Sequence, residues 1–322
     1  MKSKTKYNLS DNQIIRIFKE NNIENIIEIK PLNEGMFNSV YNIRTENKEY
    51  VLKIAPKKSQ KVMTYEKNML QSELFWYDVI YKNTNIYTPK IYFSSQKNNN
   101  IIESDYFVME KINGLQRNKA KLSTKKKLEM TAKIIAEFHN VKNDKYGYIQ
   151  NELYDNWYDA LSNMIINIIN DAKEVGKFTE KGENLLKYAN KYKNILKKSE
   201  CTMVNYDLWD ANMICSDNKV TVIDPERTFW GDPVFDFICA EGFTKPLSTK
   251  TQTIDIHNSI SDIKIEINRE SEIRYAFAQG YMALIQEVER YYRFTRLSEG
   301  WIFDKFCSDL LYKSAFKVLE NE

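Results

Sequence analysis

The residues whose types and spacing could carry out chemistry lie in one stretch of this chain, VNYDLWDANMICSDNKVTVIDPERTFWGDPVFDF (residues 204–237). Asn212 follows Asp207 by five positions, and Asp224 follows a short strand-like run at 220–223. A loop aspartate can accept a hydroxyl proton, while an asparagine and a second aspartate hold Mg²⁺ against ATP phosphates. Each residue alone would be explained by the preference of Asp and Asn for turns. The spacing of all three predicts phosphoryl transfer.

Length and composition indicate a globular protein of ordinary charge. The 322 residues suffice for two lobes, each with its own core. The net charge is only +3, and no aromatic-interleaved basic stripe is present, so the basic stretches 57–61 and 117–127 are interpreted as solvated surface. We therefore expect no nucleic-acid partner. The only histidines are His139 and His257, which argues against a histidine metal centre or a Ser-His-Asp triad.

Several sequence features favour a cytoplasmic protein. The four cysteines are scattered without Cys-x-x-Cys pairs, as expected in a reducing compartment. The first residues lack the apolar core of a signal peptide. No apolar run reaches the length that spans a bilayer, so no membrane partner is expected either. The sequence does not indicate an oligomeric state.

The first 110 residues predict a small, mainly antiparallel sheet. Ser10 can cap a helix. Two strand-like runs, one within 30–43 and one at 49–54, are separated by a turn and form a hairpin. Gly35 lies in the turn before it, where the chain could fold over a ligand, although most turn glycines simply supply a positive φ. A further strand is expected at 105–110, followed by a linker at 110–114.

Lys53 is the polar residue of interest within this sheet. It ends the apolar run VLK, and a lysine that points inward there needs a partner, because burying an unpaired ammonium is costly. The helix predicted at 64–81 offers Glu66 and Glu73 on one face. Glu73 is preferred because apolar residues flank it, and Glu66 remains an alternative.

The rest of the chain is predicted to be helical. His139 is interpreted as a packing or helix-dipole residue, and residues 247–262 as the most mobile loop. Helices are expected at residues 123–141, 152–175, 179–198, 272–294 and 301–319.

Taken together, these residues resemble the aminoglycoside phosphotransferase family, a bacterial branch of the protein-kinase-like fold. The resemblance extends from about Ile26 to the C-terminus and is strongest in NYDLWDANMI and VIDPERTFWGDPVFDF. It implies an α+β, bilobal protein-kinase-like fold, with a small antiparallel-sheet N-lobe and a mainly helical C-lobe. We expect residues 1–110 to form the nucleotide-binding lobe. Residues 111–322 would carry the catalytic loop and the acceptor site.

The family motif also implies roles for individual residues. Asp207 would be the catalytic carboxylate, and Asn212 and Asp224 would hold Mg²⁺. Asp232 and Asp236 would be mainly structural. The ATP-binding residues would be the loop around Gly35, the pair of Lys53 with Glu73, and the backbone of Glu110 and Ile112 at the adenine.

The chain departs from the family pattern in two places. The usual His-Gly before the catalytic aspartate is Asn205-Tyr206, and asparagine can still donate and accept hydrogen bonds. The nucleotide loop, residues 33–39, contains a single glycine, as in the antibiotic-kinase branch.

Only six residues separate Asp224 from Gly231, which leaves no room for a long activation loop and favours a small-molecule kinase.

The acceptor is the part of the function that the sequence defines least. A hydroxylated small molecule is expected, with an aminoglycoside or related antibiotic ranked first; macrolide, choline-like and sugar acceptors, or a kinase-fold binding protein with weak or no turnover, are alternatives. Candidate acidic contacts, most of them expected to be solvated helix charges, are Glu241, Glu270, Glu272, Glu287, Glu289 and Asp309. Candidate stacking residues, most of them expected to be core, are Tyr275, Phe277, Tyr281, Tyr291, Tyr292 and Trp301.

Overall fold

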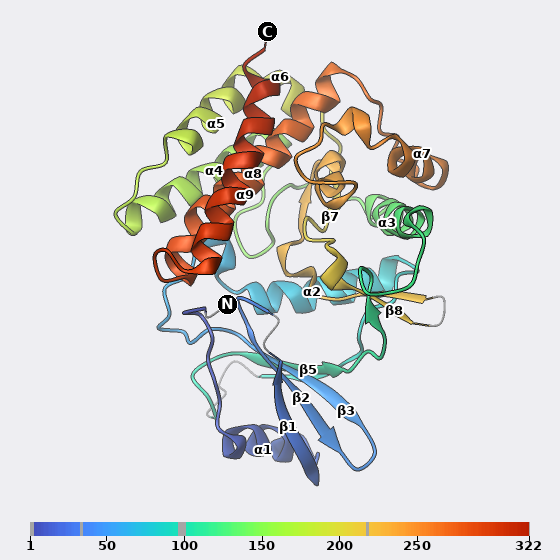
Figure 1. Ribbon diagram of the computed structural model, residues 1–322, viewed down its shortest axis with the longest axis vertical. Coiled ribbons are helices and arrows are strands. Elements are labelled where there is room, and N and C mark those ends of the chain that lie inside the picture. Colours follow the sequence, from blue (N-terminus) through green and yellow to red (C-terminus); the bar gives the residue numbers. More distant parts are fainter. Residues whose placement is uncertain (1–2, 33–34, 96–100, 217–218, 322) are drawn as a thin grey trace.

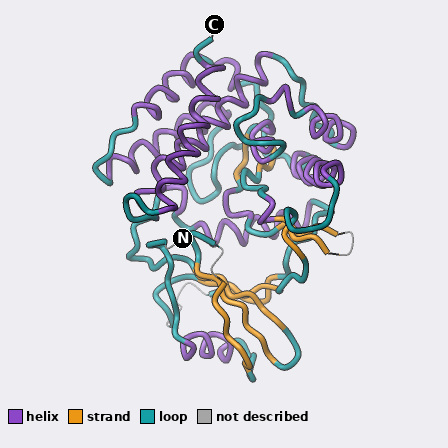
Figure 2. Tube along the Cα trace, in the orientation of Figure 1, coloured by secondary structure: helices purple, strands orange, loops and turns teal. Residues whose placement is uncertain are grey.

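The computed structural model describes residues 3–32, 35–95, 101–216 and 219–321. A five-stranded sheet lies at one end of the molecule, and most helices gather at the other (Figures 1 and 2). The fold is therefore mixed, as the sequence predicts, with an antiparallel sheet and a larger helical part. Among the described residues, none of the helices combines the length and apolar character that a bilayer crossing requires.

The five-stranded sheet has the strand order β1-β2-β3-β5-β4, with antiparallel neighbours throughout. Its central strand, β3, pairs Lys53 with Val40 on one side and Phe107 on the other. The strand expected within 30–43 is divided between two strands, because the chain turns back at the nucleotide loop. The strands are β1 (Ile26–Leu32), β2 (Ser39–Thr45), β3 (Glu49–Ile54), β4 (Ile91–Ser94) and β5 (Tyr106–Glu110).

Two helices cover the two faces of this sheet. Helix α1 (Asp11–Glu20) begins at the capping box of Ser10 and Gln13 and packs Phe18 against the sheet. Helix α2 (Met69–Asn83) packs Tyr77 against the opposite face and turns Trp76 into the core of the helical part. Helix α2 thus joins the two hydrophobic cores.

The helix expected at 64–81 is interrupted in the structure. A single 3-10 turn, Thr64–Glu66, comes first, and Asn68 then adopts a left-handed conformation with φ of 58° before α2 begins. Asparagine tolerates this conformation better than most residues because its short polar side chain bonds locally. The break separates Glu66 from Glu73, which then face different surroundings.

The helical part is organised around α8 (Arg269–Arg293), a helix buried over most of its length. Gly280 lets α5 approach it closely, because a side-chain carbon at this position would lie 2.6 Å from Leu185. The neighbouring helices are α3 (Thr124–His139), α4 (Trp157–Glu174), α5 (Glu180–Lys191), α6 (Lys193–Leu196) and α9 (Glu299–Leu319).

The region expected to be a mobile loop, 247–262, is structured, and that expectation is wrong. It contains the 3-10 turn Leu247–Thr249 and helix α7 (Thr251–Ile260), which packs on α3. Its His257 is buried and bonds His139, 2.8 Å away. The helix was not recognised in the sequence because few residues of this segment face the core, so its apolar pattern is weak.

Short strands hold the predicted catalytic stretch in place. Strands β7 (Thr202–Val204) and β10 (Phe229–Gly231) pair with one another. Strands β6 (Leu115–Gln116), β8 (Met213–Ser216) and β9 (Lys219–Val222) form a separate three-stranded sheet. The β8–β9 hairpin connects Asn212 to Asp224 and so brings these two residues to the same end of the sheet.

Candidate active site

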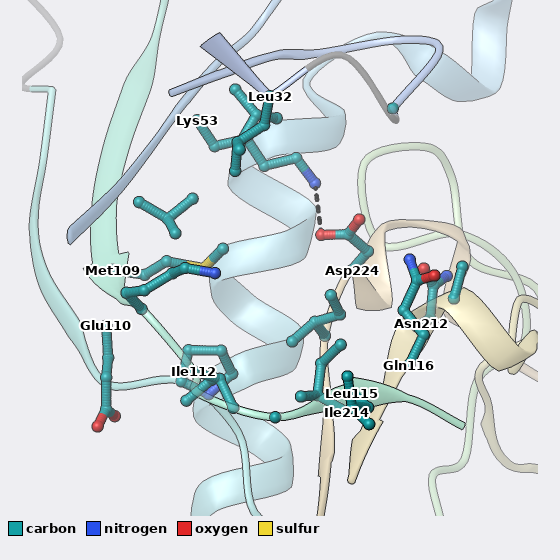
Figure 3. A pocket seen from close by; sticks show the side chains of 18 of the residues that line it. Leu32, Lys53, Met109, Glu110, Ile112, Leu115, Gln116, Asn212, Ile214 and Asp224 are labelled. Atoms are coloured by element: carbon teal, nitrogen blue, oxygen red, sulfur yellow. Dashed lines mark hydrogen bonds and ion pairs between the residues drawn. The ribbon is translucent and has the colours of Figure 1, made fainter. Parts of the chain in front are cut away.

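Lys53 lies at the meeting point of the sheet and the helical part. Its side chain is 3% exposed, and its ammonium is 2.7 Å from Glu73 of α2. The same nitrogen lies 3.1 Å from Asp224 and 2.9 Å from Glu226. Three carboxylates thus surround one ammonium (Figure 3 shows the contact with Asp224).

The two glutamates proposed as partners of Lys53 have different roles. Glu73 makes the ion pair with Lys53, whereas Glu66 lies 2.5 Å from Arg293 of α8. Burial raises the pKa of Glu73 to about 8; the Lys53 ammonium opposes this shift, and the negative charges of Asp224 and Glu226 add to it. Burial lowers the pKa of Lys53, but Asp224, Glu226 and Glu73 together raise it well above its ordinary value. The cluster therefore carries more negative than positive charge.

The loop that carries Asp207 is held from behind by Asp236. One carboxylate oxygen of Asp236 accepts the backbone N–H groups of Asn205 and Tyr206, at 2.9 and 3.0 Å. Tyr206 has a φ of 60°, a left-handed conformation that non-glycine residues adopt only where the surroundings impose it. The side-chain oxygen of Asn205 accepts the backbone N–H of Asp207 at 3.1 Å. Asn205 thus organises the loop by hydrogen bonding in place of the family histidine.

Asp207 and Asn212 are in direct contact. The amide nitrogen of Asn212 donates to the carboxylate and to the backbone carbonyl of Asp207, at 2.9 Å each. Burial raises the pKa of Asp207 to about 7, and the Arg227 guanidinium counteracts part of this shift. A half-buried carboxylate with a raised pKa can take a proton from a hydroxyl group near neutral pH.

Asp224 adopts a strained conformation at the end of the hairpin. Its φ and ψ are both 54°, and a non-glycine residue in this region costs on the order of 1–3 kcal/mol. Two bonds hold it there: the Asp224 N–H donates to the Tyr77 hydroxyl, and the neighbouring Ile223 N–H donates to the Asn212 carbonyl, both at 3.0 Å. The strain turns the Asp224 carboxylate toward Lys53 (Figure 3).

A cavity of about 410 Å³ extends from these polar residues along the sheet. Lys53, Asn212 and Asp224 line one end of it, and Glu110 and Ile112 line the other. Figure 3 shows the Glu110 carboxylate directed away from Lys53 and Asp224. The apolar lining comes from both parts of the molecule: Leu32, Val40, Val51, Met109, Leu115, Ile214 and Ile223. A cavity with an apolar lining and a polar end suits a nucleotide.

Gly35 also lines this cavity, as the sequence predicts for the nucleotide loop. Asn38, three residues after Gly35, is buried, and its side-chain amide donates a hydrogen bond to Glu226 at 2.9 Å. The first residues of the predicted loop, 33 and 34, lie outside the described residues.

Sequence reasoning missed two charged residues of the site, Glu226 and Arg227. They follow Asp224 directly in the 3-10 turn Pro225–Arg227, where Glu226 reaches Lys53 and Arg227 lies 3.0 Å from Glu289 of α8. The Asp-Pro pair, which announces a tight turn, could have indicated that the next side chains return to the site. Arg117 was also misread as solvated surface, since it is buried and paired with Asp210 at 2.5 Å.

The two carboxylates expected to be structural are buried and have partners within the helical part. Asp232 accepts the Val234 N–H at 3.1 Å and lies 2.8 Å from Arg274. Asp236, besides supporting the catalytic loop, lies 3.2 Å from His139.

The six acidic residues considered for the acceptor already have partners. Glu289 pairs with Arg227 and Arg293, and Asp309 pairs with Lys181 and Lys305. The remaining four bond as follows: Glu287 to Thr179 and Tyr312, Glu272 to the backbone at 247 and 248, Glu270 to Lys198, and Glu241 to Thr253. None of them forms an open acidic cleft.

Most of the aromatic residues considered for stacking belong to the core. Buried ones are Tyr275, Phe277, Tyr281 and Tyr292, as the sequence predicts for most of the group. Tyr291 and Trp301 are partly exposed, and both rings lie about 5 Å from the Arg290 guanidinium, at 5.0 and 4.8 Å. Arg290 therefore packs beside both rings, which also contact each other edge to face at 6.3 Å.

Solved structures share this fold over nearly the whole chain. A candidate fructosamine-3-kinase from Haemophilus somnus 129PT has a TM-score of 0.66 and 19% identity, with 92% of this chain and 96% of that chain covered. ADP-bound aminoglycoside phosphotransferase APH(2'')-Ib has a TM-score of 0.59 and 19% identity, covering 96% and 99%. A thermostable APH(4)-Ia mutant in complex with AMP-PNP and hygromycin B has a TM-score of 0.61 and 11% identity, covering 94% and 98%.

At the level of sequence, the model of the phosphotransferase enzyme family, abbreviated APH, matches residues 28–248. A search of curated proteins gave no match. The family match covers both the sheet and the catalytic stretch, and the shared fold extends it to the C-terminal helices. The chain therefore belongs to the phosphotransferase enzyme family and is a small-molecule kinase.

Proposed function

We propose that this protein transfers the terminal phosphoryl group of ATP to a hydroxyl group of a small molecule. The observation that carries the proposal is the contact of Asp207 with Asn212 beside a cavity that Lys53 and Asp224 also line. A base, an amide ligand, a carboxylate ligand and a phosphate-binding ammonium are the parts that phosphoryl transfer needs.

The lining of the cavity supports the following placement of the nucleotide. Adenine would lie at the apolar end against the backbone of Glu110 and Ile112, and the phosphates would lie at the polar end beneath the loop of Gly35. Lys53, fixed by Glu73, would contact the α- and β-phosphates. The apolar lining contributes affinity by removing the base from water.

The residues at the polar end fit Mg²⁺ that arrives with the nucleotide. The Asp224 side chain is 36% exposed beside the cavity. The side-chain N–H of Asn212 donates to Asp207, which leaves the side-chain oxygen of Asn212 to act as a ligand. In the part of the chain that the structure describes, no group of three or more His, Cys, Asp or Glu side chains could hold a metal ion alone. Mg²⁺ is typically bound by one or two protein ligands together with substrate phosphates, where it neutralises charge that develops during transfer.

The transfer itself would be mostly a matter of positioning. The acceptor hydroxyl gives its proton to the Asp207 carboxylate, and its oxygen forms a new bond to the terminal phosphorus. The bond from that phosphorus to the bridging oxygen breaks, and ADP leaves with the electron pair. Because the transition state is loose, alignment and charge neutralisation supply most of the catalysis.

The loop geometry favours turnover over the alternative of a binding protein without turnover. The replacement of His-Gly by Asn205-Tyr206 was the reason to consider that alternative. Asn205 bonds the backbone of Asp207, and Asp236 holds both replaced residues. The base is therefore supported although the motif has changed.

The acceptor is proposed to be a hydroxylated small molecule. An aminoglycoside was ranked first from the sequence, but a polycation would have to open existing pairs, such as those of Glu289 and Asp309, to find carboxylates. We therefore propose an acceptor with few positive charges and keep the aminoglycosides in the test as the competing class.

The test is ATP consumption by the purified protein with Mg²⁺ across aminoglycosides, macrolides, choline and neutral sugars. We expect phosphorylation of at least one neutral or singly charged compound, identified by a mass increase of one phosphate. Selective phosphorylation of aminoglycosides would overturn the acceptor class and keep the reaction. Failure of ATP to bind, measured by calorimetry with Mg²⁺, would overturn the proposed function.

A further inference from the structure

The first residues of the chain lie across the nucleotide loop and attach it to the helical part. Figure 1 shows the N-terminus between the sheet and the helices. Lys4 donates its backbone N–H to the carbonyl of Arg293, the last residue of α8, at 2.8 Å. The hydroxyl of Thr5, which is buried, lies 2.9 Å from the Phe37 carbonyl and 3.2 Å from the Met36 carbonyl. This N-terminal segment thus belongs to the site, although it is remote from it in sequence.

Lys6 is the residue of this segment whose side chain contacts the nucleotide loop. Its ammonium donates to the Asn38 carbonyl at 2.8 Å, which takes one of its three N–H donors. A side-chain carbon at Gly35, a residue that lines the cavity, would lie 3.9 Å from the same nitrogen. The side-chain amide of Asn38 donates a hydrogen bond to the Glu226 carboxylate, and the Lys53 ammonium donates to the same carboxylate, both at 2.9 Å. Lys6 therefore lies at the end of a chain of contacts that leads to the phosphate-binding lysine.

The surroundings of the Lys6 ammonium favour the binding of an anion. Burial lowers its pKa, the positive charge of Lys53 lowers it further, and Glu226 counteracts only part of this effect. Glu226 is itself engaged with Lys53 and Asn38. A half-buried ammonium held near a second ammonium is stabilised when a phosphate group binds between or beside them.

The charge balance of the site leads to the same conclusion. Asp224 and Glu226 already exceed the charge of Lys53 even when Glu73 is protonated, and a polyphosphate adds several negative charges more. Mg²⁺ offsets part of this excess. We propose that Lys6, supplied by the N-terminal segment, is a second ammonium that contacts the phosphates of the nucleotide beneath the Gly35 loop. This inference rests on the proposed function, because it requires a nucleotide in the cavity.

Lys6 could instead have a purely structural role and hold the loop in place through Asn38. The two roles are distinguished by comparing nucleotides with one, two and three phosphates. Calorimetric affinities for AMP, ADP and ATP would be measured for wild type and Lys6→Gln, which keeps a donor for the Asn38 carbonyl but removes the charge. We expect ADP and ATP to bind about tenfold more weakly, since hydrogen bonds to charged groups are strong, and AMP to change less than twofold. Lys6→Arg should recover most of the loss.

Two further variants serve as controls. Lys19→Gln removes an exposed positive charge of α1 and should leave all three affinities unchanged. Thr5→Val loosens the attachment of the loop without changing charge, and any loss should be equal for the three nucleotides. In the wild type, ADP affinity should fall more steeply with salt than in Lys6→Gln.

An equal loss for AMP, ADP and ATP in Lys6→Gln, or no loss, would overturn the inference while leaving the kinase proposal intact. Failure of the wild type to bind any of the three nucleotides would instead overturn the proposed function.

Discussion

The two sides of the cleft between the sheet and the helical part differ in how their charges are paired. On the nucleotide side, three carboxylates share Lys53 beside a cavity of about 410 Å³. On the α8 side, carboxylates and guanidinium groups are matched, as in the buried network of Glu66, Glu289, Arg227 and Arg293. Charge that is left in excess beside a cavity marks a ligand site, whereas matched charge marks structure. The difference is the basis on which we propose nucleotide-binding residues, whereas the paired acids give no such basis for proposing acceptor residues.

The largest effect is expected where the two sides meet, at Asp207. Asp207→Asn keeps an acceptor for the Asn212 amide but removes the base, so turnover should fall by roughly 10²–10⁴-fold. Nucleotide affinity should stay within about threefold, because Asp207 is not part of the cavity lining. Steady-state ATP consumption with the acceptor found by the panel, together with calorimetry for ATP, measures both quantities.

Asp210→Asn is the matched control for this substitution. Asp210 lies in the same loop, but its carboxylate pairs with Arg117 and its side chain is 42% exposed. It should retain most of the activity. Comparable losses in the two variants would mean that loop integrity, and not a base at Asp207, limits the reaction.

A smaller effect, on stability, is expected from the matched network of the α8 side. Arg293→Met leaves Glu66 without its 2.5 Å partner and weakens the compensation of Glu289. Breaking a buried ion pair from one side typically costs about 3–5 kcal/mol of unfolding free energy. Nucleotide affinity should change much less, because this network is structural. Urea unfolding and calorimetry of the same variant test the two statements together.

The exposed pairs of Asp309 provide the comparison. Asp309→Asn removes contacts with Lys181 and Lys305 at a position where the side chain is 44% exposed, so it should cost less than about 1 kcal/mol. If Arg293→Met were as mild as Asp309→Asn, the network would not be structural. If Asp309→Asn raised the acceptor KM tenfold, the acidic pairs would open for the acceptor, and the two sides of the cleft would be alike.

The pairing of Lys53 with Glu73 and the closeness of Asn212 to Asp224 followed from local patterns in the sequence, and their roles in nucleotide binding stay predictions. Asp207, Asn212 and Asp224 are linked by one hairpin, and Lys53 needs a glutamate that the next helix supplies. These constraints act within short stretches of chain, so spacing carries most of the information. The preference for Glu73 over Glu66 also followed from local burial, and Glu73 is the residue that lies against Lys53.

Contacts between distant segments could not be predicted in the same way. Glu226 and Lys53 are 173 positions apart, and Lys6 reaches a loop more than 30 residues away. Nothing in the composition of residues 247–262 revealed that His257 would be buried against His139. Such pairs depend on tertiary packing, which a single sequence does not display.

The helical part also supports the loop of Asp207 from behind, through residues of α3, α7 and the turn at 233–239, and this support should depend on pH. Asp236, which holds the loop backbone, contacts His139, and His139 contacts His257. Burial, together with His139, lowers the pKa of His257 to about 3. In the unfolded chain this histidine binds a proton below about pH 6.5, whereas in the fold it stays neutral, so its contribution to stability is present above that pH and is lost as the pH falls. Between pH 7 and 5 the wild type should lose about 2 kcal/mol more than His257→Gln, measured by urea unfolding at each pH. Parallel pH profiles for the two proteins would show that His257 is not held neutral, and would leave Asp236 alone as the support of the loop of Asp207.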